Sequence, residues 1–303
     1  MTEKIYYKKE AGRSFSRKEF LNYLEKKTLE TIQKWDMFDR DSKIAVAVSG
    51  GKDSTTLIHI LDKIEREFPS ELFMIHLDEG IQNYSDRSKL IVKETAKNLG
   101  VPLYVKSIKE RFGVTIDEVA TVSAKKRRHS PCAYCGVWRR WLMNHLANKV
   151  HADRLVTAHC LDDEAQTILL NVLRGSLTGL LRLKTRPKSI PGVVPHVKPF
   201  RSLPEKEITL YAQLKDLDYN DKACPHAEEG MRWGIRQWLY RQEERYPGTY
   251  HAILNIGTKI SRRLTASDQR KEIRNCEVCG YPASGGALCQ AHKFKRRFQE
   301  LLG

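Results

Sequence analysis

Short apolar runs alternate with segments of helical spacing along most of the chain. Residues 43–48 form a β-branched apolar run, which is typical of a strand buried in a parallel sheet, and residues 55–64 have helical spacing. The same patterns predict further strands at 72–77, 103–108 and 154–158, and further helices at 17–35, 85–99, 136–149 and 162–174. This alternation predicts an α/β fold with a doubly wound parallel sheet, whose ligands bind at the carboxyl ends of the strands.

A glycine-rich turn follows the first strand of this predicted sheet. Its residues are Ser49, Gly50, Gly51, Lys52, Asp53 and Ser54. A turn between a strand and a helix aims free backbone N–H groups at an anion, and the glycines let the backbone approach a phosphate closely. Lys52 adds a positive charge. The spacing is not that of ordinary kinases and GTPases, and a plain strand-to-helix turn is the alternative.

Polar residues also follow two other predicted strands, at 78–80 and 159–163. Because the carboxyl ends of parallel strands share one edge of a sheet, we expect these residues to converge with the glycine-rich turn on one site.

Seven cysteines in 303 residues speak against a disulfide framework and for metal binding or catalysis. Four residues near the C-terminus have the spacing of a tetrahedral zinc site, namely Cys276, Cys279, Cys289 and His292. Basic residues at 293–297 follow them directly, so this zinc module is predicted to present phosphate-binding charge. Thiols scattered in a flexible tail are the alternative.

Cys132 and Cys135 form a second pair, and the distant Cys224 could add a third thiolate. The spacing fits a redox pair, half a zinc site or part of an iron–sulfur site, and it does not choose among them. Three protein thiolates would leave a fourth metal position open. Cys160 has no partner at ligand spacing, and we expect it to be a small buried residue.

The formal net charge of +16 indicates a polyanionic partner such as nucleic acid. Residues 125–142, 182–201 and 259–303 each carry six excess positive charges. Such segregation predicts a binding surface assembled from separate stretches, with independent solvated loops as the alternative. No apolar run approaches about 18 residues and the N-terminus is charged, so we expect a cytoplasmic protein without a membrane span.

Together these motifs resemble a known family. Residues 49–54 resemble the PP-loop of N-type ATP pyrophosphatases, which split ATP to AMP and pyrophosphate. With the motifs at 77–84, 132–140, 159–164, 171–175, 198–201 and 224–225, the chain from about residue 20 resembles the TtcA/TtuA family of tRNA thiolases. It is most similar to the cytoplasmic tRNA 2-thiolation branch, which modifies the wobble uridine.

The resemblance implies an ATP-dependent tRNA 2-thiouridine synthetase. Cys132, Cys135 and Cys224 would hold a [4Fe–4S] cluster whose fourth iron carries sulfide, with a persulfide mechanism as the alternative. The 49–54 loop would bind ATP and Mg²⁺. The residues implied to surround the adenosine are His76, Asp78, Gly80 and His159. Asp163 would have an essential polar role near the base or ATP.

In the implied reaction, uracil O2 attacks the α-phosphate of ATP, and sulfide then displaces AMP at C2. The expected target is uridine 34, with uridine 54 or cytidine 32 as alternatives. The implied partners are tRNA, a sulfur donor (a ubiquitin-like thiocarboxylate carrier or free sulfide) and a second copy of the chain. Competing interpretations are a lysidine synthetase, which does not need the three central cysteines, and a non-catalytic zinc-containing tRNA-binding subunit.

Basic residues around the central cysteines are expected to contact tRNA, namely Lys125, Lys126, Arg127, Arg128, Arg139 and Arg140. Some thiolases that act on the T-loop carry Lys where this chain has Arg139. Because Arg does not exchange a proton at neutral pH, we expect Arg139 to bind phosphate, which favours the wobble branch. Relatives usually begin with a second zinc module, whereas residues 1–40 contain no cysteine.

We divide the chain into an N-terminal helical segment (1–41), a PP-loop ATP pyrophosphatase domain (42–220), a helical extension carrying Cys224 (221–270) and a C-terminal zinc-binding module (271–303).

Overall fold

The computed structural model describes residues 3–66, 70–126, 129–181, 183, 190–229, 231–264 and 273–302. Arg127 and Arg128, predicted to contact tRNA, lie outside the described residues, as does much of the basic stretch 182–201.

Five parallel strands form the central sheet, in the order β5-β4-β3-β6-β7. They are β3 (Lys43–Ala47), β4 (Glu71–Asp78), β5 (Leu103–Ser107), β6 (Arg154–Val156) and β7 (His196–Val197). The predicted α/β fold with a parallel sheet is therefore confirmed, and the short edge strand β7 adds to it. The strand order reverses direction between β3 and β6, which is the point where such sheets bind ligands.

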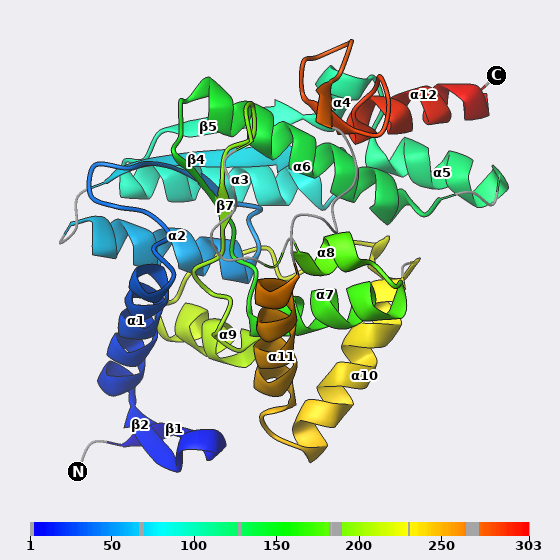
Figure 1. The fold of residues 1–303 in the computed structure, drawn as a ribbon. Coiled ribbons are helices and arrows are strands. Elements are labelled where there is room, and N and C mark those ends of the chain that lie inside the picture. Colours follow the sequence, from blue (N-terminus) through cyan, green and yellow to red (C-terminus); the bar gives the residue numbers. More distant parts are fainter. Residues whose placement is uncertain are drawn as a thin grey trace.

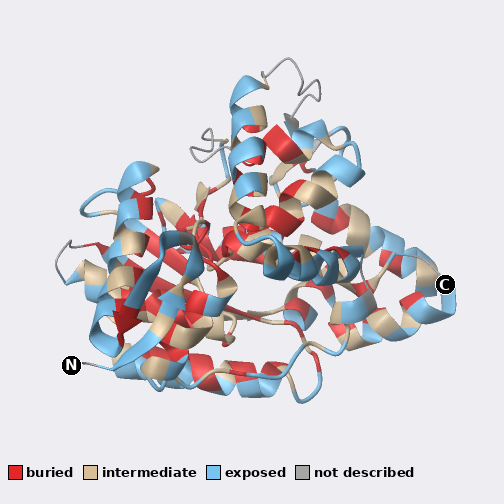
Figure 2. Ribbon diagram, turned by 90° about the horizontal axis from the view of Figure 1, so that it is seen from below, coloured by how far each residue is buried: buried red, intermediate tan, exposed pale blue. Residues whose placement is uncertain are grey.

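Helices cover both faces of the sheet (Figure 1). On one face, Ile44 and Val46 of β3 belong to an apolar cluster with α2 (Lys52–Glu65), α3 (Ser85–Leu99) and α9 (Glu205–Leu214). On the other face, Ala45 packs in a second cluster with α6 (Pro131–Lys149), beside α4 (Ile108–Phe112) and α5 (Ile116–Lys126). This alternation along β3 is what a strand buried on both sides requires, and Figure 2 shows buried residues running through the sheet and the inner sides of its helices.

The N-terminal segment contains a hairpin as well as the predicted helix. Strands β1 (Lys4–Lys8) and β2 (Arg13–Ser16) pair antiparallel, and α1 (Arg17–Lys34) follows with a capping box between Ser16 and Glu19. The ammonium of Lys8 lies 2.7 Å from the fully buried Glu207 of α9. The hairpin is thereby fixed to the helix that lies against α2.

Four helices form a third apolar cluster beside the sheet (Figure 1). They are α7 (Leu161–Leu173), α8 (Leu177–Leu181), α10 (Met231–Arg245) and α11 (Thr249–Arg263). Gly257 allows α11 to approach α7 closely, because a Cβ there would lie 2.6 Å from Ile168. Within the described residues, no helix is long and apolar enough to cross a membrane.

Helix α6 begins five residues earlier than the predicted start at residue 136. Pro131 occupies its first turn after the extended Ser130, and a proline is suited to this place because its missing N–H is not needed there. Cys132 and Cys135 consequently lie in the first turns of a helix and not in a loop.

The C-terminal module packs on α6. It consists of β8 (Ile273–Asn275), β9 (Pro282–Ser284) and α12 (Gln290–Leu302). The indole N–H of Trp138 donates to the carbonyl of Ala291 at 3.1 Å, and the ring of Tyr134 meets that of Phe294 edge-on at 4.9 Å. The helix that carries the cysteine pair thus forms the base of this module.

Candidate active site

The glycine-rich turn ends at the N-terminus of α2. Gly51 is the N-cap, so the first N–H groups of the helix are available to an anion. The hydroxyls of Ser49 and Ser54 lie 3.0 Å apart and fix the turn. Gly50 has φ +85°, and a Cβ there would lie 2.8 Å from the carbonyl oxygen of Ser88. No other residue type would fit this conformation without moving α3.

Lys52 lies among carboxylates. Its ammonium is 2.6 Å from Glu205 Oε1 and 3.3 Å from Asp53. Burial raises the pKa of Asp53 to about 6, against the opposing effect of Lys52. Burial also acts to lower the pKa of Lys52, but the two carboxylates outweigh it and the pKa is raised. Lys52 therefore carries its charge at neutral pH.

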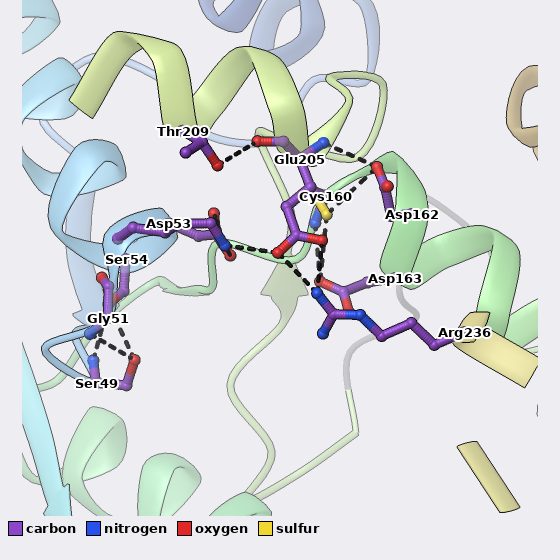
Figure 3. Close-up of polar contacts among 11 residues, drawn as sticks. Ser49, Gly51, Asp53, Ser54, Cys160, Asp162, Asp163, Glu205, Thr209 and Arg236 are labelled. Atoms are coloured by element: carbon purple, nitrogen blue, oxygen red, sulfur yellow. Dashed lines mark hydrogen bonds and ion pairs between the residues drawn. The ribbon is translucent and has the colours of Figure 1, made fainter. Parts of the chain in front are cut away.

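The start of α7 faces the turn from β6. Cys160 is the N-cap, and its N–H donates to Asp163 Oδ2 at 3.2 Å. Asp162 Oδ2 accepts the backbone N–H of Glu205 at 2.8 Å, and burial raises the pKa of Asp162 to about 6. Figure 3 shows these side chains between the glycine-rich turn and α10. Cys160 is 1% exposed, which confirms the expected small buried residue.

The residues expected near adenosine lie along the same edge of the sheet. His76 hydrogen-bonds the carbonyl of Val48 through Nδ1 at 2.8 Å, and burial lowers the pKa of His76. Its Nε2 is buried and has no hydrogen-bond partner among the described residues. Gly80 donates to Asp78 Oδ1 at 2.9 Å. Burial lowers the pKa of His159 to about 3, so both imidazoles are neutral.

The central cysteines come together from two distant segments. The thiol of Cys132 donates to the carbonyl of His226 at 3.1 Å, two residues beyond Cys224. Burial raises the pKa of Cys135 to about 12, with Cys224 and Cys132 close enough to contribute. Among the described residues, these three thiols do not form a group as tight as that of a single-ion site. A four-iron cluster spaces its thiolates more widely than one ion does.

Arg139 and Glu79 form an ion pair beside the cysteines. Arg139 Nε lies 3.3 Å from Glu79 Oε1, and Glu79 is 7% exposed. Burial acts to lower the pKa of Arg139, but the charge of Glu79 and a hydrogen bond to Cys135 outweigh burial and the pKa is raised. A positive charge therefore lies next to a thiol that would become anionic on binding a metal. Whether Arg139 also contacts tRNA phosphate stays a prediction.

Asn220 joins the Cys224 segment to the glycine-rich turn. Its backbone N–H donates to the carbonyl of Gly50 at 2.8 Å, and its side-chain amide donates to Ser88 Oγ at 2.9 Å and to the carbonyl of Tyr84 at 3.2 Å. Asn220 is 6% exposed. Asn220 thus attaches the segment that carries Cys224 to the predicted phosphate-binding turn.

The four C-terminal ligands lie together as predicted. The ligand atoms of Cys276, Cys279, Cys289 and His292 are all within 4.8 Å of one another. The Cys279 and Cys289 sulfurs are 3.8 Å apart, and His292 Nδ1 lies 3.3 Å from the Cys289 sulfur. Tetrahedral zinc with bonds of about 2.3 Å separates its ligands by about 3.8 Å. The donor set and spacing fit a structural zinc ion.

Several of the basic residues that the sequence predicts to contact tRNA are exposed. Lys125 and Lys126 are exposed at the end of α5, and Arg140 is exposed on α6. Arg297 of α12 contacts His129 at 2.5 Å, so the basic residues of α12 lie close to those of α5. Two of the basic stretches noted in the sequence therefore share one surface.

Several residues at this edge had no signal in the sequence. Glu205, Asn220, Arg232 and Arg236 reach the site only through contacts between distant segments, whereas Glu79 lies in the polar stretch 78–80 that the sequence indicated. The motif at 198–201 has a structural role instead. Lys198 lies 2.5 Å and Arg201 3.4 Å from the buried Glu164, which is 2% exposed.

Comparison with known proteins matches this chain to one family. A family model described as a PP-loop domain matches residues 20–243. The tRNA 2-thiolation protein NcsA of Haloferax volcanii is 36% identical over 285 residues, covering 88% of each chain. The tRNA-5-methyluridine(54) 2-sulfurtransferase of Pyrococcus horikoshii is 33% identical, covering 91% of this chain and 85% of that protein.

A solved structure shares the fold. The U34-tRNA thiolase NcsA from Methanococcus maripaludis, determined with its [4Fe-4S] cluster, superposes with a TM-score of 0.84 and 24% identity. The match covers 97% of this chain and 93% of that one.

Proposed function

The chain belongs to the PP-loop family of tRNA 2-thiolation proteins, and we propose that it is a cytoplasmic ATP-dependent tRNA 2-thiouridine synthetase. One observation carries the proposal. Asn220 bonds to Gly50 of the PP-loop, and the segment from Asn220 to His226 brings Cys224 to Cys132 and Cys135. A nucleotide loop and three cysteines on one scaffold are what activation by ATP followed by sulfur transfer requires.

The PP-loop supplies the ATP site. The N–H groups of Gly51 and the first turn of α2 would bind the phosphates together with Mg²⁺, and Lys52 would add its charge. His76 is buried and His159 half-buried, and both are neutral, which suits contact with an uncharged adenosine. Asp78 and Gly80 lie on the same edge of the sheet.

The central cysteines supply the sulfur site. Cys132, Cys135 and Cys224 fit a [4Fe–4S] cluster, because they are the three thiols gathered here and the remaining ones lie elsewhere. Such a cluster, when bound, provides an iron without a protein ligand on which sulfide is held. Cys135 is protonated as a free thiol, so metal binding would release its proton. Arg139 would then offset part of the negative charge.

In the proposed reaction the chain positions the two substrates. Uracil O2 attacks the α-phosphate of ATP and pyrophosphate leaves from the PP-loop. Hydrosulfide then adds at C2, the C2–O bond breaks, and AMP leaves with the oxygen. Asp163, at the start of α7 between the PP-loop and α10, would hydrogen-bond the activated base or orient Mg²⁺.

Basic residues from α5, α6 and α12 would hold the tRNA. Lys125, Lys126 and Arg140 are exposed, and the contact between Arg297 and His129 brings the α12 residues close to the end of α5. The four C-terminal ligands would hold Zn²⁺ and so stabilise α12 on α6. We propose uridine 34 as the target, a thiocarboxylate carrier or sulfide as the donor, a homodimer, and the four-part division of the chain given above.

Mass spectrometry of tRNA nucleosides tests this function. A strain without the gene should lose 2-thiouridine at position 34, and the wild-type gene should restore it while a Cys224→Ser gene should not. Loss at uridine 54 or cytidine 32 would correct the target position. Unchanged thionucleosides, or loss of lysidine instead, would contradict the proposal.

A further inference from the structure

Glu205 bridges two cations at the PP-loop. Its Oε1 atom lies 2.6 Å from the ammonium of Lys52 and 3.0 Å from a guanidinium nitrogen of Arg236, and its Oε2 lies 3.0 Å from that same nitrogen. Figure 3 shows Arg236 reaching from α10 to Glu205 at the start of α9. A single carboxylate oxygen thus lies between two groups that both bind phosphate oxygens well.

The surroundings are already rich in negative charge. Asp53, Asp162 and Asp163 lie close by, and the pKa of Asp53 is raised first by burial and then by Glu205 and Asp163. A triphosphate entering this site adds several more negative charges. Lys52 is already paired with two carboxylates. The triphosphate therefore binds Lys52 most strongly if it displaces one of these carboxylates.

Helix α10 holds Arg236 in place above the PP-loop. Arg232, one turn earlier on the same face, donates to Gln166 at 3.0 Å and to the carbonyl of Asp163 at 3.2 Å. These bonds join α10 to the start of α7, next to the PP-loop. Arg236 therefore stays close to the PP-loop whether or not it is paired with Glu205.

We propose that Glu205 competes with the triphosphate of ATP for Lys52 and Arg236, and that Arg236 becomes a phosphate-binding residue once Glu205 is displaced. This rests on the proposed ATP-dependent function and goes beyond it by adding a cation from the C-terminal helices to the ATP site.

Calorimetric titration of the full-length protein with ATP, pyrophosphate and adenosine, with Mg²⁺ and without tRNA, tests the proposal. Glu205→Gln removes the competing charge and should bind ATP and pyrophosphate about tenfold more tightly, the size of one charge-assisted hydrogen bond. Arg236→Gln should bind both about tenfold more weakly. Adenosine, which has no phosphate, should bind all variants equally.

Two matched variants serve as controls. Glu71→Gln removes an exposed carboxylate at the opposite edge of the sheet, and Arg241→Gln removes an exposed arginine later in α10. Both should bind ATP like the wild type, and thermal melting should show all four variants folded. Equal or weaker ATP binding by Glu205→Gln, or unchanged binding by Arg236→Gln, would overturn the inference alone. A wild-type protein that binds no ATP would overturn the proposed function as well.

Discussion

The backbone N–H of Asn220 donates a hydrogen bond of 2.8 Å to the carbonyl of Gly50, residues that are far apart in the sequence. The side-chain amide of Asn220 adds bonds to α3 and to the residue before it. The segment that ends in Cys224 is therefore attached to the PP-loop at its base. A movement of the PP-loop would therefore also move the segment that carries Cys224.

Asn220→Ala should destabilise the protein by about 1–3 kcal/mol, because the buried Ser88 hydroxyl and the Tyr84 carbonyl lose a partner. Thiolation should fall more than ATP binding, since the displaced segment carries Cys224. Denaturant unfolding and ATP titration measure the two effects. Lys222→Ala, an exposed neighbour, is the control. Unchanged stability would show that the side-chain bonds contribute nothing.

Cys224→Ala should abolish thiolation and leave ATP binding largely intact. Cys224 is the third central thiol, whereas the nucleotide loop is complete without its side chain. Iron and sulfide analysis after anaerobic purification should show loss of the cluster in this variant. The control Cys160→Ala should retain its iron, because Cys160 is the N-cap of α7 and is not one of the three central thiols. A colourless wild-type protein with full activity would refute the cluster.

Lys125→Gln with Lys126→Gln should weaken tRNA binding and lower its dependence on salt. Each phosphate contact that is lost reduces the slope of log K against log salt by about 0.7–0.9. Binding measured between low and high salt gives this slope. Lys18→Gln on the exposed side of α1 should leave it unchanged. The same slope in the double variant would place the tRNA on another surface.

Glu164 should stabilise the protein in a pH-dependent way. Burial acts to raise its pKa, but Lys198 and Arg201 outweigh burial and the pKa is lowered on folding. A carboxyl with a lowered folded pKa contributes stability above its unfolded pKa of about 4.3 and loses it as the pH falls through the folded value. Glu164→Gln should cost about 3–5 kcal/mol at pH 7, because the buried Arg201 and the half-buried Lys198 lose their partner.

The Glu164 prediction is checked by unfolding curves from pH 7 down to pH 3. The difference between wild type and Glu164→Gln should shrink with acidification. Glu30→Gln, an exposed residue paired with Lys27 on α1, should give a small difference at every pH. A Glu164→Gln difference that does not depend on pH would show that the carboxylate charge is not what stabilises this site.

The sequence by itself determined the features that depend on residues close together in the chain. The PP-loop, the four predicted strands β3 to β6 and the gathering of the four residues from Cys276 to His292 are confirmed, whereas the edge strand β7 was not predicted and α6 begins earlier than expected. Each follows from short-range chemistry: the period of apolar residues, the need for Gly50 at positive φ, and the short turns that close a tetrahedral site.

Only the tertiary structure decided the contacts between distant segments. Glu205 between Lys52 and Arg236, and Asn220 against Gly50, join residues that no local pattern connects. Likewise, the N-terminal hairpin is fixed by the buried Glu207 from α9. Such pairs are chosen by packing of the whole fold, because a buried charge or N–H must find its partner wherever folding brings one.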